Sequence, residues 1–312
     1  MTAARNVTNV AASIRQRLIN RARQRDEDFG RMLTQYAIER LLHRLGRSKY
    51  VNEFILKGAQ LFSLWTKTPH RPTRDLDLLR QGDAAMPKLE AIFREICSVP
   101  TETQDGIEFL PATVRTEAIR EQAEYNGVRV KIGYHLGGAR DVLQIDIGFG
   151  DAVVPEAVVV EYPSMLDLPT AKLRAYRRET VVAEKFHAMV LLGMANSRMK
   201  DIYDLHALAR EFPFDGATLQ QAIRATFERR RTAVPDGPPL ALSQEFADDS
   251  IKKTQWSAFV RRHDLAGQTT ELGPVLEGIR QFIMPITGTL TAGVPFDQTW
   301  QPGEGWGKPS AA

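Results

Sequence analysis

FILKG at residues 54–58 and RDLDLL at residues 74–79 are the stretches that decide the fold of this chain. The apolar run 54–56 predicts a buried strand, Gly58 predicts a tight turn, and residues 59–65 predict a short helix. The N–H groups at the start of such a helix can hold a phosphate, and Lys57 adds a positive charge beside them. The sequence therefore predicts a phosphate-binding strand, turn and helix.

Two carboxylates follow in the second stretch. Asp75 and Asp77 come after a loop with two prolines and lie in a predicted strand over residues 75–79. Residues two apart on a strand point to the same face about 7 Å apart, so the two side chains can share one or two Mg²⁺ ions, or Mn²⁺ in their place. An isolated Asp-x-Asp is also common at solvated strand edges and turns.

A third acid makes the metal hypothesis stronger. VLQIDIG at residues 142–148 predicts a central strand that carries one charge, Asp146. A buried carboxylate is unfavourable unless it is paired, hydrogen-bonded or bound to a metal. Because the two upstream acids have the wrong charge for pairing, the sequence favours a metal site formed by Asp75, Asp77 and Asp146.

The bulk composition is that of an ordinary globular protein, and 312 residues are enough for two subdomains. The single cysteine, Cys97, excludes an intramolecular disulfide framework and a thiolate metal cluster, and is predicted to be a core thiol on a helix over 84–98. The N-terminus has no apolar signal-peptide core, and the apolar run 188–195 is too short to span a bilayer. We therefore expect a cytoplasmic protein without membrane segments.

Positive charge is concentrated at the start of the chain. Residues 1–50 contain eleven Lys or Arg against four Asp or Glu, a net charge of +7 in a chain that totals +3. Such asymmetry suits a polyanion such as RNA, although amphipathic helices with solvated arginine faces are a common alternative. The candidate RNA contacts form two clusters: Arg15, Arg17, Arg21, Arg23 and Arg25, and Arg229, Arg230 and Arg231.

The order of periodic segments predicts a sheet-containing domain followed by a helical one. A helix over 29–45 is expected to end at Gly46. The predicted strands of a mixed sheet are 112–119, 128–136, 142–149 and 158–162, and the later predicted helices are 179–193, 199–210, 217–230, 242–260 and 271–282. The predicted domains are 1–165, 166–286 and an irregular tail over 287–312, whose Trp300 and Trp306 favour docking on the surface.

The helical half contains two further candidates, Lys185 and Asp204. Lys185 flanks the apolar stripe of its helix. An equally good interpretation is a surface lysine whose methylene stem lies along apolar neighbours while its charge stays in water. Asp201 and Asp204 lie three apart and so share a helix face. Helix capping explains Asp201, near the predicted helix start, but not Asp204, one turn further in.

Six stretches together resemble the nucleotidyltransferase AbiEii/AbiGii toxin family, which includes the MenT toxins that modify tRNA. The resemblance covers nearly the whole chain, and each stretch is weak alone. They are YAIERLL at 36–42, FILKGA at 54–59, RPTRDLDLL at 71–79, LQIDIGFGD at 143–151, AEKF at 183–186 and NSRMKDIYDL at 196–205.

The resemblance implies an α+β fold, in which a DNA polymerase β-like nucleotidyltransferase mixed sheet with flanking helices is joined to a helical C-terminal domain. It implies transfer of nucleotides from an NTP to an RNA acceptor, such as the tRNA 3′ end, and a cognate antitoxin. It also makes Lys185 and Asp204 active-site candidates. The chain departs from the superfamily where Lys57-Gly58 replaces the usual Gly-Ser, and from many toxins where Ala59 replaces Gly.

These residues suggest a hypothesis for the reaction. Asp75 and Asp77 bind Mg²⁺ on the triphosphate, while Asp146 completes a second metal site and helps to deprotonate the acceptor hydroxyl. Asp204 orients either Lys185 or the nucleotide. The phosphate oxygens and the loop are contacted by Lys57, Gly58, Thr73, Arg74 and Lys185.

Two other functions remain compatible with the sequence. A shared core does not fix the acceptor, so the enzyme can instead modify a protein or a small molecule. An inactive protein that acts only by binding its antitoxin is the second reading, which the presence of all three acids disfavours. A phosphohydrolase is disfavoured because no His-Asp metal pattern is evident among the six histidines.

Overall fold

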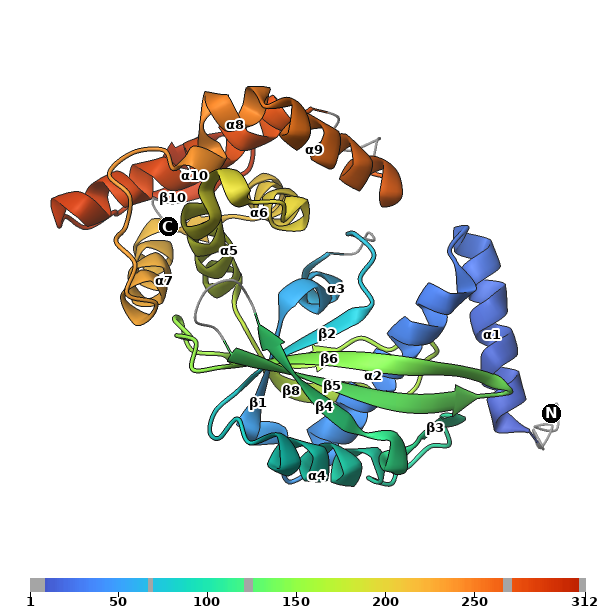
Figure 1. Cartoon of the computed structure of the whole chain (residues 1–312). Helices are drawn as coiled ribbons and strands as arrows, with labels where there is room; N and C mark the ends of the chain where they lie inside the picture. Colours follow the sequence, from blue (N-terminus) through green and yellow to red (C-terminus); the bar gives the residue numbers. More distant parts are fainter. Residues whose placement is uncertain (1–8, 67–69, 121–125, 266–270, 309–312) are drawn as a thin grey trace. The chain divides into compact units, whose positions relative to one another are not determined.

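The structure is a computed structural model that describes residues 9–66, 70–120, 126–265 and 271–308 (Figure 1). The chain divides into two compact units, Met1–Gly150 with Val158–Ala175, and Asp151–Ala157 with Tyr176–Ala312. This division differs from the predicted boundary after residue 165 because a further strand, β8 (Ala171–Ala175), pairs with β1 (Phe54–Lys57) and keeps the chain in the first unit.

The first unit is built on a mixed sheet, as the sequence predicts, and the described residues form eight strands in it. The strand order is β3-β5-β6-β2-β1-β8-β7, and β4 also pairs with β5. The β2–β6 and β1–β8 pairs are parallel and the others are antiparallel. The remaining bounds are β2 Asp75–Arg80, β3 Ile107–Phe109, β4 Arg115–Arg120, β5 Asn126–Leu136, β6 Ala139–Phe149 and β7 Val158–Tyr162.

Alternating side chains give this sheet one apolar and one polar face around its centre. Leu76 and Leu78 of β2 and Ile145 and Ile147 of β6 are buried, whereas the acids between them are only half-buried. Helices α2 (Phe29–Arg47) and α4 (Met86–Cys97) cover the apolar face, with α1 (Val10–Arg25) beside α2 (Figure 1). The ring contact between Phe54 and Phe93, 5.7 Å between centroids, fixes α4 on β1.

Gly46 does not end α2, contrary to the prediction from sequence. The helix continues to Arg47, and a Cβ at Gly46 would lie 2.7 Å from the carbonyl oxygen of Lys172 on β8. Glycine is therefore needed here because the helix and the strand approach closely. Sequence rules for helix ends do not include such a contact between distant segments.

Cys97 is a core thiol, as predicted. It is buried at the end of α4, and burial raises its pKa to about 12. Among the helices that the structure describes, none has both the length and the apolar character that crossing a bilayer requires.

The second unit is mainly helical. Its helices are α5 Arg178–Leu192, α6 Met199–Glu211, α7 Gly216–Arg229, α8 Gln244–Asp248, α9 Ser250–Arg262 and α10 Leu272–Ala292. The predicted helix over 242–260 is interrupted at Asp249, whose side chain caps α9 by accepting a hydrogen bond from the Lys252 amide. Helix α10 extends well past the predicted end at residue 282, with Pro285 inside it, and ends at Gly293.

The C-terminal tail is docked, as expected, but it is not irregular. Strands β10 (Thr299–Gln301) and β11 (Gly305–Gly307) form a small sheet with β9 (Phe214–Asp215). The Trp300 indole N–H donates to the carbonyl oxygen of Ala209 at 2.6 Å, and that of Trp306 donates to Phe282 at 2.8 Å. Both indoles therefore have apolar neighbours and a polar partner, which holds the tail on the helices.

Candidate active site

Sheet register brings the three predicted acids to one face of the first unit. Asp75 and Asp77 are two apart on β2, and Asp77 is the in-register partner of Asp146 on the parallel strand β6. In-register partners point to the same side of a sheet, so all three carboxylates share the polar face. Gln144, level with Asp75, donates from its side-chain amide to Asp75 Oδ1 at 3.1 Å.

The end of β1 lies beside the same carboxylates. Lys57 is the in-register partner of Asp77 across the antiparallel β1–β2 pair. Gly58 follows with φ of 72°, and a Cβ on it would lie 2.0 Å from Asp77 Oδ2. Glycine at this position therefore makes room for the Asp77 carboxylate. From the sequence alone, Gly58 is instead explained by a tight turn and a contact with phosphate oxygens.

The predicted helix over 59–65 is shorter and less regular than expected. Residues Gly58–Leu61 form a 3₁₀ turn, and α3 covers only Phe62–Trp65. The Thr66 amide and hydroxyl both donate to the Phe62 carbonyl oxygen and close the helix after one turn. So short a helix has little dipole, which weakens the predicted phosphate site at its start.

Gln60 is hydrogen-bonded to the main chain of β2 at Asp75. Its side chain is fully buried, and its amide donates to the main-chain carbonyl oxygen of Asp75 at 3.3 Å. Its own carbonyl oxygen accepts hydrogen bonds from the Tyr162 hydroxyl and the Gln35 amide, both at 2.7 Å. This buried network fixes the start of the strand that carries both aspartates.

Arg129 is a residue of the site that the sequence analysis missed. Its Nε donates to Asp146 Oδ1 and its Nη2 to Asp146 Oδ2, both at 2.8 Å. The hydrogen bond to Asp146 raises the pKa of Arg129, and the charges of Asp146, Asp75 and Glu117 act in the same direction. The premise that Asp146 lacks a pairing partner was therefore wrong. The alternation Val128, Arg129, Val130, Lys131 was the signal that could have found this partner.

The carboxylates suit a hard divalent cation that arrives with its substrate. Among the described residues, no group of three or more His, Cys, Asp or Glu side chains is arranged to hold a metal ion. Mg²⁺ is usually held by one or two carboxylates together with substrate phosphates, and not by a complete protein cage. Asp75 and Asp77, side by side on β2, fit that pattern, whereas Asp146 is engaged by Arg129.

The two other candidates near this site are Thr73 and Arg74, in the segment that leads into β2. Thr73 is half-buried in the segment before β2. Arg74 is exposed and lies 3.4 Å from an Asp28 oxygen, through its Nη2. A surface ion pair with this geometry contributes little to stability, so it does not explain why an arginine occurs here.

Lys185 and Asp204 are in contact within the second unit. Lys185 Nζ lies 2.8 Å from Asp204 Oδ2 and 2.6 Å from Asp201 Oδ1, and both carboxylates are buried. Asp201 also accepts from Arg198 Nε at 2.6 Å. Burial opposes ionisation of Asp201, but the charges of Lys185 and Arg198 outweigh it and hold its pKa below the ordinary value. Asp201 is thus a Lys185 partner, and helix capping does not account for it.

Replacing Lys185 with Met is expected to lower the free energy of unfolding by about 3–5 kcal/mol, because two buried carboxylates, Asp201 and Asp204, both lose their contact with the Lys185 ammonium group. Urea denaturation followed by circular dichroism measures the change. Lys200→Met, an exposed lysine on the same helix as Asp204, is the matched control and should change stability by less than about 0.5 kcal/mol. Equal effects of the two substitutions would contradict the assigned ion pairs.

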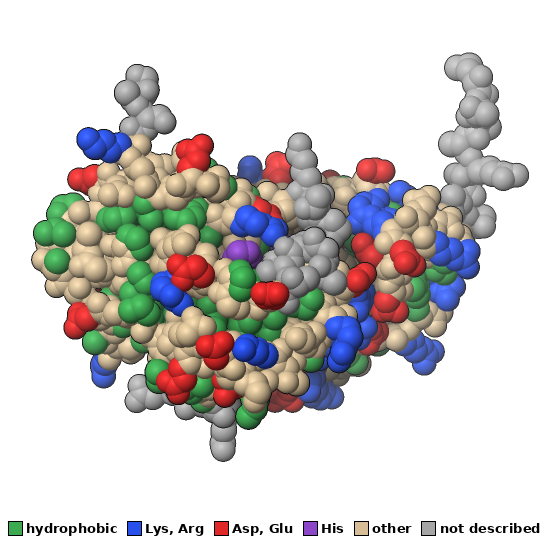
Figure 2. All heavy atoms as spheres, turned by 90° about the horizontal axis from the view of Figure 1, so that it is seen from above, with side chains coloured by type: hydrophobic (Ala, Val, Ile, Leu, Met, Phe, Trp, Pro, Cys, Tyr) green, Lys and Arg blue, Asp and Glu red, His purple; other side chains and the backbone are tan. Residues whose placement is uncertain are grey.

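The arginines of α1 divide into anchored and exposed ones. The Arg15 guanidinium lies over the Phe29 ring, 5.6 Å from its centroid, and Arg17 donates to the Leu166 carbonyl oxygen at 2.8 Å. Arg21 is half-buried, whereas Arg23 and Arg25 are exposed, as is Arg17 despite its hydrogen bond. On the face drawn in Figure 2, Lys and Arg side chains gather over this helix with acidic ones between them. Arg23 and Arg25 are better candidates for phosphate contacts than Arg17, whose guanidinium is held by the Leu166 carbonyl oxygen.

The second arginine cluster is divided as well. Arg229 and Arg231 are exposed, but Arg230 is largely buried, with its Nη2 2.8 Å from Asp151 Oδ1 and its Nη1 3.1 Å from His187 Nδ1. Burial first, and then the charge of Arg230, lowers the pKa of His187 to about 4, so that it is neutral at pH 7. These contacts favour a structural role for Arg230 over the predicted RNA contact.

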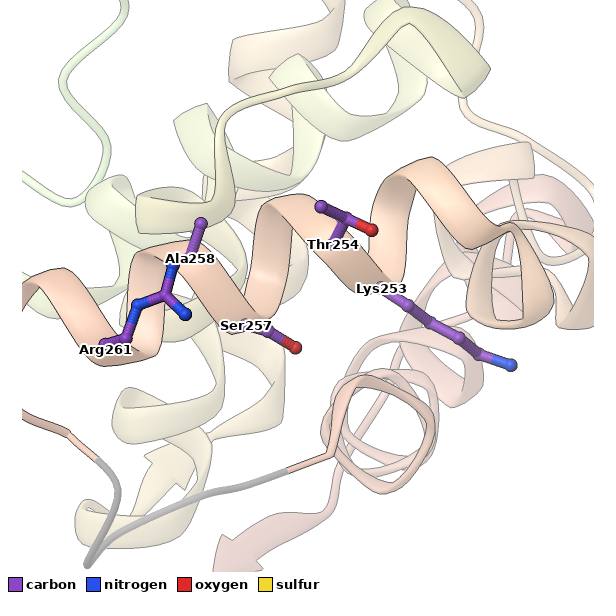
Figure 3. A pocket seen from close by; sticks show the side chains of 5 residues that line it. All are labelled: Lys253, Thr254, Ser257, Ala258 and Arg261. Carbon is purple, nitrogen blue, oxygen red and sulfur yellow. The ribbon is translucent and has the colours of Figure 1, made fainter.

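A hollow of about 280 Å³ lies on α9 of the second unit (Figure 3). Its lining residues are Lys253, Thr254, Ser257, Ala258 and Arg261. All five come from one helix and none is a carboxylate, so this hollow lacks the acidic groups that a metal-assisted transfer needs.

The chain was compared with family models, curated proteins and solved structures. The model of the family described as "Nucleotidyl transferase AbiEii toxin, Type IV TA system" matches residues 40–280. No curated protein matches the chain.

Two crystal structures from Helicobacter pylori are similar to the chain. The protein JHP933 has a TM-score of 0.48 and 14% identity, covering 86% of this chain and 94% of its own. A protein described as a candidate nucleotidyltransferase has a TM-score of 0.45 and 13% identity, covering 91% and 96%. Similarity at this level adds nothing about the reaction. The family match, which spans most of the chain and both units, shows that the chain belongs to the nucleotidyl transferase AbiEii toxin family of type IV toxin–antitoxin systems, and that it is a nucleotidyltransferase.

Proposed function

We propose that this toxin transfers nucleotides from an NTP to RNA in the cytoplasm, with the tRNA 3′ end as the acceptor, in a reaction that depends on a divalent cation. The observation that carries the proposal is the sheet register, which places Lys57, Asp77 and Asp146 opposite one another on three adjacent strands, with Gly58 against the Asp77 carboxylate. A lysine beside two neighbouring carboxylates suits a triphosphate that carries a metal ion, because the carboxylates can hold the metal and the lysine can contact the phosphates. Membership of a toxin–antitoxin family implies an antitoxin partner.

Asp75 and Asp77 are the residues proposed to hold the cation, Mg²⁺ or Mn²⁺. The cation, when bound, neutralises charge on the phosphates during transfer. Lys57, level with Asp77, is proposed to contact phosphate oxygens from the strand next to the acids. Asp146, opposite Asp77, is proposed as the third acid, which holds a second cation together with Asp77 beside the acceptor hydroxyl. Fixed groups of this kind accelerate phosphoryl transfer through position and charge, with no covalent step on the protein.

Lys185 and Asp204 are also proposed to be required for transfer. The support for Lys185 is the AEKF stretch at 183–186, and its proposed role is contact with the phosphates of the NTP. The 2.8 Å contact between the two side chains supports Asp204 as the residue that orients Lys185. Thr73 and Arg74 are proposed as further contacts of the phosphate or of the loop before β2.

The direct test incubates the purified protein with total tRNA, Mg²⁺ and each α-labelled NTP in turn. The expected result is label on tRNA with at least one NTP, and none when a chelator replaces Mg²⁺. Periodate oxidation of the tRNA beforehand destroys the terminal 2′,3′-diol, so it should abolish labelling if the 3′ end is the acceptor.

Each other outcome rejects a defined part of the proposal. Label that persists on oxidised tRNA rejects the 3′ end as the acceptor. Label on protein rejects RNA in favour of protein modification. Failure to label either macromolecule, from any NTP, rejects the RNA transfer reaction.

The exposed arginines of α1 give a prediction about RNA binding. Each phosphate contact contributes about 0.7–0.9 to the slope of log affinity against log salt concentration. Changing both Arg23 and Arg25 to Gln should therefore weaken tRNA binding and flatten that slope by about 1.5. Filter binding over a range of salt concentrations measures it. Lys253→Gln with Arg261→Gln, on α9, is the matched control with the same loss of charge. A slope that the α1 substitutions leave unchanged would exclude these contacts.

A further inference from the structure

Five charged residues lie at one level across the polar face of the first sheet. Sheet register pairs Lys57 with Asp77, Asp77 with Asp146, Asp146 with Arg129, and Arg129 with Glu117, along strands β1, β2, β6, β5 and β4. In-register partners point to the same side, so the five side chains form one row. Its charges run positive, negative, negative, positive, negative from β1 to β4. We call this row the charge row.

The two neighbouring acids in the charge row need a counter-ion. Carboxylates directly opposite each other on adjacent strands repel. Arg129 supplies the counter-ion on the Asp146 side, because its side-on pair engages both carboxylate oxygens at 2.8 Å. A divalent cation held by Asp77 and Asp146 would meet the same need, and it would use the same oxygens of Asp146.

The Arg129–Asp146 pair can be exchanged, because it is partly open to water. The side chain of Arg129 is 29% exposed and that of Asp146 is 23% exposed. Ion pairs near the surface are weak enough for another cation to compete with them. An alternative partner is already close, because Glu117 Oε1 lies 3.8 Å from Arg129 Nη1 on the other side of the guanidinium. Glu117 is itself 48% exposed and is bridged to Lys131 at 2.9 Å.

We propose that Arg129 is a displaceable counter-ion of the acidic site, which holds Asp146 while the carboxylates lack a divalent cation and turns to Glu117 when a cation takes them. Arg129 is then a positioning residue that acts through Asp146, and it sets the cation concentration at which the site fills. The inference rests on the proposed function, because it takes Asp77 and Asp146 as cation ligands.

The test measures Mn²⁺ binding to the whole protein without NTP or RNA, from the electron paramagnetic resonance signal of free Mn²⁺. Arg129→Gln removes the competitor, so the dissociation constant for Mn²⁺ should fall by at least about fivefold. Arg129→Lys keeps the charge but cannot form the side-on pair, and should give an intermediate value. The same order is expected for the Mn²⁺ concentration that half-saturates nucleotide transfer.

Lys131→Gln is the matched control. Lys131 lies on the same face of β5, loses the same charge and also contacts Glu117, but it is level with Gln144 and not with an acid of the charge row. Exposed charges are screened over about 8 Å at physiological salt, so this substitution should change the Mn²⁺ dissociation constant by less than about twofold. If Lys131→Gln increased Mn²⁺ affinity as much as Arg129→Gln does, the loss of any nearby positive charge would explain the effect, and the proposal would be overturned.

Two further variants separate the failure of this inference from failure of the proposed function. Asp77→Asn should abolish the high-affinity Mn²⁺ site, and unchanged binding would reject the cation site itself. If Asp77→Asn abolishes binding but Arg129→Gln leaves it unchanged or weaker, only the displaceable counter-ion is rejected. Adding Asp146→Asn to Arg129→Gln should cancel the gain, and a gain that persists would show that Arg129 does not act through Asp146.

Discussion

Asp77→Asn is expected to reduce nucleotide transfer by at least about 10³-fold while the far-ultraviolet circular dichroism spectrum and the melting temperature stay close to those of the wild type. Asp77 lies between Lys57 and Asp146 in the charge row, and its carboxylate lies against Gly58. Asparagine has nearly the same shape but lacks the charge that holds a divalent cation. Loss of several kcal/mol of charge stabilisation in the transition state corresponds to this drop in rate.

The measurement is the initial rate of transfer from the labelled NTP to tRNA, at saturating Mg²⁺. Asp141→Asn is the matched control, because Asp141 is exposed on β6, five residues before Asp146, and its carboxylate accepts a hydrogen bond from the neighbouring Val142 amide. It should retain wild-type activity. Activity of Asp77→Asn within about tenfold of wild type would remove Asp77 from the reacting centre.

Gly58→Ala is expected to reduce transfer by at least about 100-fold, with a loss of about 1–2 kcal/mol in the free energy of unfolding. The loss of stability comes from a left-handed backbone, since φ is 72°. The loss of activity comes from the new methyl group, which would lie 2.0 Å from Asp77 Oδ2 and must displace that carboxylate. A displacement of about 1 Å in a reacting group is enough for a hundredfold loss.

Gly138→Ala separates these two effects. Gly138 also has a positive φ, 87°, in the turn between β5 and β6, but a Cβ there meets nothing within 4 Å. It should lose similar stability and keep its activity. Transfer rates are compared at a temperature at which both variants are folded. Equal activity of the two variants would show that Gly58 is needed only for its backbone conformation.

Much of the central fold could be predicted from the sequence, because period-two alternation is strong where one sheet face is buried. Strand β7 has the predicted bounds, and β2, β5 and β6 include the strands predicted there. Strand β8 was missed because it is five residues long and its lysine and arginine interrupt the apolar pattern. Helix α10 was predicted too short because Pro285 is normally read as a stop.

The acids of the candidate site were easier to predict than their partners. Asp75 and Asp77 lie two apart on one strand, so local periodicity was enough to place them on one face. The Arg129–Asp146 pair depends on which strand lies next to β6 and on its register, which no local pattern contains. The same holds for Asp201, whose pairing with Lys185 joins two helices and was hidden by a simpler capping explanation.

The path of the chain between its two units limits how the protein can be divided into fragments. Residues Asp151–Ala157 belong to the second unit although both neighbouring strands belong to the first. This excursion carries the carboxylate that pairs with Arg230 and the Val154 carbonyl oxygen that accepts from the Thr180 hydroxyl at 2.9 Å. A fragment that begins at residue 176 would therefore lack part of its own interior, and Arg230 would lose its Asp151 partner. Truncations designed to map antitoxin binding should be replaced by full-length variants, or by a rearranged chain in which the excursion is joined to the helical part.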